Sequence, residues 1–337
     1  MVVLTAVLDL VVLPLSKRLL ANMLGVRLKY LTWIATQLKE GSDQFYTKVK
    51  IPKGRGRYRV VYKVDGRLRF VHSRLKDLLQ VSVPATGTSY AYEPGCKITD
   101  TVTRMNGSKL LLSIDFKNHF GSVSMWQVTK MLEYHGADPE VAFLIARLCC
   151  ITVGKKSFLP QGSVVSPLLS NRVCEHLLDP VLEQAFPDAT ITRYSDNLYL
   201  GYDNNKVNGR DTLSKLREVV RLSTGWRCHK SRIMPYYRRQ RGLGLVLNEE
   251  PNMPREKYLS LKALLHNLCT KDQAAQLIRA QKDFGFIEFS VSELLMRIKC
   301  QLVYWNQFLN QNRANNLQAL LHKAEQINDR HTHNSNP

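Results

Sequence analysis

The sequence predicts an α+β protein in which a mixed region is followed by an all-helical one. Up to Pro251, short apolar strands and alternating hairpins are interleaved with helices. From Arg255 onward, every apolar repeat has helical spacing. The prolines at 251 and 254 therefore indicate a domain boundary. With 337 residues, of which 44% are hydrophobic, the chain is long enough to bury more than one core.

The N-terminal segment, Val2 to Leu15, is apolar, carries Asp9 and has no basic region before it. It is about 14 residues long and too short to span a bilayer, so we expect a buried helix or one that docks on a partner. Residues 16–39 follow with leucines at helical spacing and predict one helix. Residues 48–64 alternate around a basic turn, Lys53 to Arg57, which predicts a strand hairpin.

Further along the chain, two apolar strand patterns lead into acidic residues. Lys109 to Ile114 ends at Asp115, and the alternating segment Thr190 to Tyr202 has Ser195-Asp196-Asn197 at its turn. Asp138-Pro139 and Ser166-Pro167 each predict an N-cap followed by a proline in the first helical position. The other expected elements are helices over 74–79, 124–134, 138–150, 166–186 and 211–224, a strand over 241–248, and C-terminal helices over 255–268, 271–283, 290–310 and 313–328.

The charge balance indicates a polyanionic partner. Lysine and arginine total 48 against 28 aspartate and glutamate residues, which gives a formal net charge of +20. Enzymes of small metabolites rarely need such an excess, whereas each phosphate that a basic surface neutralises releases counterions and favours binding. Nucleic acid is therefore the favoured partner. An anionic membrane surface is a distant second, and a merely well-solvated basic surface is the neutral interpretation.

Seven cysteines are spread through the chain without a Cys-x-x-Cys pair. Most lie in apolar or helical stretches, which is typical of buried free thiols in a reducing cytosol. The sequence therefore predicts a cytoplasmic protein without a zinc site.

Asp115 and Asp196 are the candidate catalytic residues. They are far apart in sequence, yet each follows a short apolar strand, and neighbouring strands would bring the two carboxylates together. A pair of carboxylates near a basic cleft suits Mg²⁺, which takes oxygen ligands and keeps substrate phosphates as the others. Two such ions stabilise both the attacking and the leaving oxygen of phosphoryl transfer. Either residue alone would be ordinary turn chemistry.

A series of short motifs surrounds these two residues. The motifs are Ile51-Pro52-Lys53, Arg59-Val60 and Leu75-Lys76; Leu111 to Asp115 followed by His119-Phe120; Leu159 to Ser163 followed by Ser166 to Asn171; Tyr194 to Asn197; His229-Lys230-Ser231; and Gly242 to Asn248 with Pro251-Asn252 and Arg255. In order and spacing, over residues 20–325, the series resembles the bacterial reverse transcriptases of the branch that contains group II introns, retrons and their defence-associated relatives. The combination is specific, although each piece alone is not.

The resemblance implies a right-hand polymerase fold with an antiparallel palm sheet and an all-α thumb. N-terminal helices and fingers would occupy residues 1–108. The palm would occupy residues 109–250, with finger helices at 125–158, and the thumb residues 251–330. Independently of the resemblance, the polar composition of the last segment predicts a disordered tail over residues 331–337.

The resemblance also implies residues that bind metal and move protons. Asp115 and Asp196 would hold two Mg²⁺ ions, with Mn²⁺ as an alternative, and the main-chain carbonyl of Phe116 would be a further ligand. Asn197 would stand beside them in the catalytic group. Lys230 would protonate the leaving pyrophosphate, because general-acid catalysis needs a positioned proton donor. A surface lysine without such a role is an equal alternative.

Other positions would bind the incoming deoxynucleotide. Phe120 matches the aromatic residue that stacks under the sugar and excludes a 2′-hydroxyl, and a core phenylalanine is the alternative. Gln161 and Gly162 would line the nucleotide and template pocket, where glycine lets backbone approach a base closely. Lys53 and Arg59 would grip the triphosphate, or else form a solvated hairpin face.

The sequence departs from the family in three places. The third palm motif, usually Tyr-x-Asp-Asp, ends here in Asn197, which offers one neutral oxygen in place of a carboxylate. Residues 98–104 lack the Asn-Ala-x-x-His signature of retron enzymes, and Gly242-Leu243-Gly244 stands where those enzymes have Val-Thr-Gly. These differences favour a divergent group associated with defence against phage.

Two functions follow from this pattern. The first is an RNA-directed DNA polymerase that makes cDNA from an associated non-coding RNA in anti-phage defence. The alternative is a non-catalytic or template-independent RNA-binding subunit of a defence complex, with Asn197 as a mark of decay; retention of the other motif residues weighs against it. Expected partners are the structured RNA, its DNA product and deoxynucleoside triphosphates. A second defence protein or self-association stays open, and no membrane partner is expected.

Overall fold

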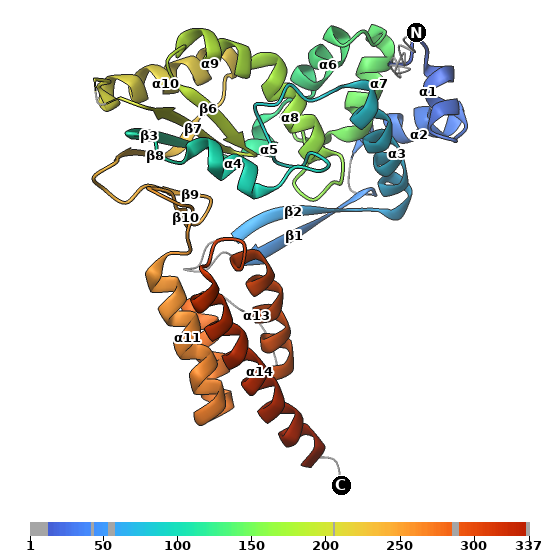
Figure 1. The fold of residues 1–337 in the computed structure, drawn as a ribbon. Coiled ribbons are helices and arrows are strands. Elements are labelled where there is room, and N and C mark those ends of the chain that lie inside the picture. The colour runs from blue at the N-terminus through green and yellow to red at the C-terminus, as the bar shows by residue number, and fades with distance from the viewer. Residues whose placement is uncertain (1–12, 42–43, 53–57, 205, 285–289, 335–337) are drawn as a thin grey trace, which may run out of the picture. The chain divides into compact units, whose positions relative to one another are not determined.

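The computed structural model describes residues 13–41, 44–52, 58–204, 206–284 and 290–334 (Figure 1). The chain forms two units, one extending to Met234 and the other beginning at Pro235. The N-terminal segment before Leu13 and the basic turn that holds Lys53 lie outside the described residues, so the expectations for them stay predictions. Within the described part of the chain, no helix is both long and apolar enough to cross a bilayer.

The expected helix over residues 16–39 is two helices, α1 (Lys17–Met23) and α2 (Leu28–Glu40). The chain leaves α1 at Gly25, whose φ of 67° is a left-handed conformation. The amides of Gly25 and Val26 donate to Asn22 and Ala21, each at 3.0 Å, which satisfies the last carbonyls of α1. The prediction of one helix was therefore wrong, because a left-handed glycine just after the C-cap Leu24 ends α1 despite the continuous apolar spacing.

The predicted hairpin is confirmed. Strand β1 (Tyr46–Pro52) pairs antiparallel with β2 (Tyr58–Val64) in a register that opposes Tyr46 and Val64. A long helix, α3 (Gly66–Ser82), follows directly, with Asp65 capping its first turn through a 3.0 Å bond from the Arg67 amide. The helix predicted over residues 74–79 is thus the centre of a longer one.

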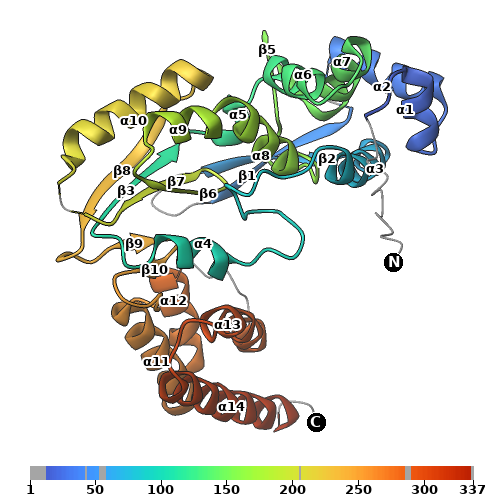
Figure 2. The same cartoon turned by 45° about the horizontal axis from the view of Figure 1, so that its top comes forward.

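Among the described residues, four strands form the central sheet of the first unit in the order β6-β7-β3-β8. They are β3 (Leu110–Phe116), β6 (Thr190–Tyr194), β7 (Asn197–Tyr202) and β8 (Cys228–Pro235). Leu112 opposes Leu200 and Ile114 opposes Leu198, and all four side chains are buried in the core. Helices α9 and α10 lie on one side of this sheet and α4 on the other (Figure 2).

The first unit also contains helices and one small hairpin outside this sheet. They are α4 (Ile98–Met105), α5 (His119–Ser122), α6 (Met125–Tyr134), α7 (Pro139–Cys149), β4 (Ile151–Val153), β5 (Lys156–Phe158), α8 (Ser166–Leu177), α9 (Asp179–Ala185) and α10 (Gly209–Thr224). The side chain of Asp138 accepts from the Glu140 amide at 2.9 Å, so its predicted N-cap role is confirmed.

The helix expected over residues 166–186 was wrong in two respects. Val165, not Ser166, is the N-cap of α8, and the buried Ser166 hydroxyl has no hydrogen-bond partner among the described residues. The helix also breaks at Leu178, where α9 begins with Asp179-Pro180. Proline lacks the amide hydrogen that a continuous helix would need there.

The second unit begins with a short hairpin, β9 (Arg241–Gly242) and β10 (Leu245–Val246), where one strand over 241–248 was expected. Leu243 and Gly244 both have positive φ, which is the two-residue turn that joins tightly paired strands. Four predicted helices follow as α11 (Arg255–Thr270), α12 (Gln273–Phe284), α13 (Val291–Trp305) and α14 (Gln311–Asn334). Helix α14 continues to Asn334 and so enters the segment expected to be a disordered tail.

Candidate active site

The sheet brings Asp115 and Asp196 to the same edge. Asp115, near the end of β3, is paired in register with Asn197, the first residue of β7. The amide of Phe116 donates to the Asp196 carbonyl at 2.9 Å, which fixes the β6–β7 turn beside the end of β3. Asp115, Asp196 and Asn197 are all half-buried. The sequence argument that neighbouring strand ends would place these acidic residues together therefore agrees with the sheet register.

The turn that carries Asp196 is tight. Tyr194 pairs with Asn197, so only Ser195 and Asp196 connect the strands, and Ser195 has a φ of 57°. The side-chain amide of Asn197 donates to Asp196 Oδ1 at 3.1 Å. One carboxylate oxygen of Asp196 is thus engaged by the residue that replaces an acidic one in the resembled motif.

The donor set of this edge is two carboxylates with adjacent main-chain carbonyls, all oxygen. Such donors suit Mg²⁺, which keeps water or phosphate as its other ligands. The described residues contain no group of three or more His, Cys, Asp or Glu side chains arranged to hold a metal. A cation held here would complete its ligands with water or with the phosphates of a substrate.

Tyr92 contacts this turn and was missed by the sequence analysis. Its hydroxyl lies 2.9 Å from the Ser195 hydroxyl. The preceding segment is attached to β6, because the Arg193 amide donates to the Thr88 carbonyl at 3.2 Å and Ser89 bridges Arg193 in parallel. Local sequence carries no signal for a contact between side chains more than 100 residues apart.

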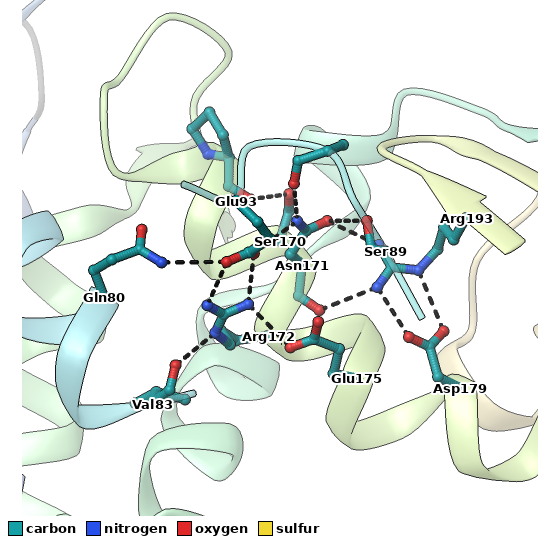
Figure 3. Close-up of polar contacts among 12 residues, drawn as sticks. Gln80, Val83, Ser89, Glu93, Ser170, Asn171, Arg172, Glu175, Asp179 and Arg193 are labelled. Carbon is teal, nitrogen blue, oxygen red and sulfur yellow. Dashed lines mark hydrogen bonds and ion pairs between the residues drawn. The ribbon is translucent and has the colours of Figure 1, made fainter. Parts of the chain in front are cut away.

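A buried polar network fixes the same segment to α8 (Figure 3). Arg172, 1% exposed, donates to both oxygens of Glu93 at 2.7 and 2.9 Å. Arg193, fully buried on β6, donates to Asp179 at 2.9 Å and to Asn171 Oδ1 at 2.8 Å. Losing one partner of such a buried pair is costly, because it leaves an uncompensated charge in the interior. The network thus holds the strand that leads into the Asp196 turn.

Phe120 lies after β3 in a cluster of rings. It is partly buried against the core, and its ring centroid is 5.6 Å from that of His119. His119 also contacts Phe116 at 5.5 Å and Trp226 at 5.2 Å. Burial, and to a lesser extent Arg193, lowers the pKa of His119 to about 3, so its ring is neutral. A partly exposed Phe120 on this support is compatible with the sugar-gate role, which stays a prediction.

Gly162 is needed for a protein contact. Its φ is +118°, and a Cβ added there would lie 2.6 Å from the Tyr62 carbonyl oxygen and 2.7 Å from Val61 Cγ1. The neighbouring Gln161 carbonyl accepts from the Tyr62 amide at 2.7 Å. The close approach at Gly162 is therefore made by strand β2. The approach of a base to the same glycine stays a prediction.

The loop after Gly162 is fixed by a buried histidine. The Ser163 hydroxyl donates to His72 Nδ1 at 2.8 Å, and His72 Nε2 donates to the Leu148 carbonyl at 2.7 Å. Burial lowers the pKa of His72 to about 4, despite the opposing bond to Leu148, so the ring is neutral. Its single N–H lies on Nε2, which faces a carbonyl, and Nδ1 is therefore the acceptor for Ser163. These two hydrogen bonds of His72 link α3, α7 and the Gln161-Gly162 loop. The sequence did not predict them.

Of the three other predicted residues, two are located by the strand that carries them. Arg59 is exposed on β2, and Lys230 is exposed on β8, the strand next to β3. Lys53 lies outside the described residues. The structure therefore joins Asp115, Phe116, Asp196 and Asn197 directly, and ties Gln161 and Gly162 to β2.

A sequence model of the family described as "Reverse transcriptase (RNA-dependent DNA polymerase)" matches residues 51–233. The matched range contains both carboxylates, Phe120, Gln161, Gly162 and Lys230. It ends at Ile233, next to the boundary of the first unit.

Three curated relatives are similar over most of the chain. The retron Mx162 reverse transcriptase of Myxococcus xanthus is 26% identical over 287 residues, covering 75% of this chain and 58% of the relative. The retron Ec86 reverse transcriptase of Escherichia coli is 26% identical over 242 residues, covering 70% and 72%. The retron Mx65 reverse transcriptase of M. xanthus is 25% identical over 262 residues, covering 73% and 61%. The match thus spans less than two thirds of the two Myxococcus proteins.

Proposed function

Since the chain belongs to the reverse transcriptase (RNA-dependent DNA polymerase) family, we propose that it copies an RNA template into DNA at the site formed by Asp115 and Asp196. The observation that carries the proposal is the register of β3 and β7. Direct pairing of Asp115 with Asn197, and the bond from Phe116 to Asp196, put two carboxylates at one sheet edge. The retron-like relatives support the same activity class.

In this reaction the 3′-oxygen of the growing strand forms a bond to the α-phosphorus of a deoxynucleoside triphosphate, and the bond to pyrophosphate breaks. Asp115, Asp196 and the Phe116 carbonyl would hold two Mg²⁺ ions, which when bound stabilise the attacking and leaving oxygens. The half-buried carboxylates fix the position of that charge before substrate arrives. Lys230, exposed on the adjacent strand, would deliver a proton to the leaving pyrophosphate.

Binding of the incoming nucleotide is assigned to the surrounding loops. Phe120 would lie under the sugar and exclude a 2′-hydroxyl. Gln161 and Gly162 would form the floor under the base pair, held in place by β2 through Tyr62. Arg59, with Lys53, would contact the triphosphate from that hairpin. In these assignments β1 and β2 belong to the fingers, the four-stranded sheet to the palm, and α11–α14 to the thumb.

We further propose that the template is a structured non-coding RNA that stays bound to the protein and acts in anti-phage defence. The net charge of +20 favours a polyanionic partner. The three relatives described above are all named as retron reverse transcriptases. The proposed activity therefore includes a dedicated RNA and its DNA copy as partners.

A second candidate function rests on Asn197. Its amide engages Asp196 Oδ1 and supplies no negative charge, so the site holds less charge for a cation than a site with three carboxylates. A non-catalytic or template-independent RNA-binding subunit would be compatible with that loss.

One experiment separates these functions. The protein is purified at low salt, the copurified RNA is sequenced, and labelled deoxynucleotide incorporation is measured before and after RNase treatment. The proposal expects one defined RNA, a complementary DNA product and loss of synthesis after RNase. Synthesis that survives RNase would indicate template-independent activity, and recovery of only bulk ribosomal fragments would remove the dedicated template.

A further inference from the structure

A basic cavity of about 860 Å³ lies in the first unit, beside the catalytic end of β3. Residues from three separate chain segments line it: the segment 117–127 after β3, without Phe120; residues 155–158 of the β4–β5 hairpin; and residues 224–227 between α10 and β8. The roles assigned above to Phe120, Gln161, Gly162 and Lys230 use none of the residues that line this cavity.

The charge of the cavity has one sign. Lys117, Lys155, Lys156 and Arg227 line it, all four are exposed, and its lining contains no aspartate or glutamate. Within the described part of the chain, none of the four forms an ion pair, whereas Lys130 on nearby α6 pairs with Glu133 at 2.6 Å. Cations gathered in a concave surface without carboxylates favour a ligand that carries several negative charges.

The cavity also presents aromatic surface. Trp126 lines it and is 63% exposed, although an indole of this size is usually buried. Phe158 on β5 is half-buried in the same lining. Aromatic side chains beside lysines are the combination with which proteins bind single-stranded nucleic acid, because bases stack on the rings while the cations contact phosphates.

The wall between Trp126 and the 224–227 turn is held rigidly. Gln127 donates from Nε2 to the Thr224 carbonyl at 2.8 Å, and its Oε1 accepts from Trp226 Nε1 at 3.3 Å and from the Ser124 amide at 3.0 Å. A left-handed residue, Gly225, shapes the turn. A fixed wall loses little entropy when a ligand binds.

The cavity is joined to the catalytic strand. The Lys117 amide donates to the Arg227 carbonyl at 2.8 Å, two residues after Asp115. The Trp226 ring packs edge-on against Phe116 with centroids 5.5 Å apart. A strand of nucleic acid seated in the cavity would therefore lie next to the site of synthesis.

We propose that this cavity binds a single-stranded segment of the associated RNA, with phosphates at the four cations and a base stacked on Trp126. The proposal rests on the proposed function, because it supplies that enzyme with a second RNA contact outside the catalytic site. The cations come from three chain segments, which suits successive phosphates of a strand better than one compact anion.

The test uses the full-length protein and an unstructured oligoribonucleotide that carries fluorescein and 5-bromouridine. Anisotropy titrations over a range of salt give the affinity and its salt dependence, and photocrosslinking with peptide mass spectrometry gives the site. The variants are Lys155→Ala/Lys156→Ala and Trp126→Ala. The matched controls are Lys29→Ala/Lys39→Ala, which removes the same charge from exposed positions on α2, and Tyr134→Ala, which removes an aromatic ring 71% exposed on the same helix as Trp126.

We expect the peptide that contains Trp126 to be crosslinked. The double lysine variant should lower the slope of log affinity against log salt by roughly 1.4, because each lost phosphate contact on single strands contributes about 0.7. Trp126→Ala should weaken binding at least about fivefold with the slope unchanged, since stacking contributes about 1–3 kcal/mol per base. The controls should leave both quantities near wild type.

An unchanged slope in Lys155→Ala/Lys156→Ala, or crosslinks that leave the Trp126 peptide unlabelled, would overturn the proposal. Loss of the crosslink on adding nucleoside triphosphates alone would make the occupant a free nucleotide and would overturn it as well. Deoxynucleotide incorporation is measured on the same wild-type preparation. An inactive protein that still crosslinks through Trp126 would refute the polymerase function and leave the RNA site standing.

Discussion

Asn197 is paired across the sheet with Asp115 and donates a hydrogen bond from its amide to Asp196. Asn197 is therefore a neighbour of both Asp115 and Asp196. It occupies the position where the resembled motif has a second acidic residue. Asn197 supplies a neutral amide where that motif has a negative charge.

The first prediction concerns metal preference. A unit charge 4 Å from another contributes about 1 kcal/mol even at the dielectric constant of water. Asn197→Asp should therefore tighten apparent Mg²⁺ affinity at least about fivefold in primer extension. The wild type should be more active with Mn²⁺, which accepts nitrogen and oxygen ligands, than with Mg²⁺, and the variant should narrow that gap. If the wild type shows no primer extension with either ion while Asn197→Asp is active, the result would favour the non-catalytic function.

The second prediction concerns sugar selection. Phe120→Ala should admit ribonucleotides that the wild type rejects, because the ring that would occupy the space of a 2′-hydroxyl is removed. We expect the ratio of kcat/KM for deoxy- over ribonucleotides to fall about tenfold or more, equivalent to about 1.4 kcal/mol. Phe143→Ala, at a ring 49% exposed on α7, is the control. An unchanged ratio would leave Phe120 as a core residue only.

The third prediction concerns the close approach at Gly162. Gly162→Ala should destabilise the protein by roughly 1–3 kcal/mol from its backbone conformation alone, and by more because the new Cβ would meet Tyr62 and Val61. It should also raise KM for deoxynucleotides. Gly154→Ala is a matched control, since Gly154 also has a positive φ but no atom within 4 Å of an added Cβ. Equal melting temperatures for the two variants would show that the contact with β2 does not matter.

The fourth prediction concerns the buried network. Asp179→Ala would leave the fully buried Arg193 without its carboxylate and should cost about 3–5 kcal/mol in urea unfolding. The control is Glu140→Ala, which breaks the exposed pair with Lys17 and should cost at most about 1 kcal/mol. Similar losses in the two variants would contradict the assignment of Arg193 as a buried, paired cation.

Local sequence patterns predicted the hairpins and the helix start that depend on neighbouring residues. Alternation over 48–64 and 190–202 gave two hairpins, and Asp138-Pro139 gave the start of α7. The same reasoning failed where one residue interrupts a continuous apolar pattern, at Gly25 and at Pro180, although both signals are present in the sequence.

The sequence predicted the part of the candidate site that lies at the ends of strands. Asp115 and Asp196 follow from two strand patterns, but the register that pairs Asp115 with Asn197 does not. Tyr92 and the His72–Ser163 bond were missed because their partners lie 103 and 91 residues away. Gly162 was recognised as a close-approach position, whereas its neighbour on β2 required the structure.

The central claim is that Asp115 and Asp196 act in catalysis by holding metal ions. A metal-dependent primer extension assay tests it most directly. Asp115→Asn and Asp196→Asn should each lower incorporation at least about a thousandfold, because losing a metal ligand removes about 4 kcal/mol or more of transition-state stabilisation. RNA affinity and melting temperature should stay close to wild type. Asp203→Asn, at an exposed carboxylate at the other end of β7, should retain full activity. Wild-type incorporation in Mg²⁺ by either Asp115→Asn or Asp196→Asn would contradict the account.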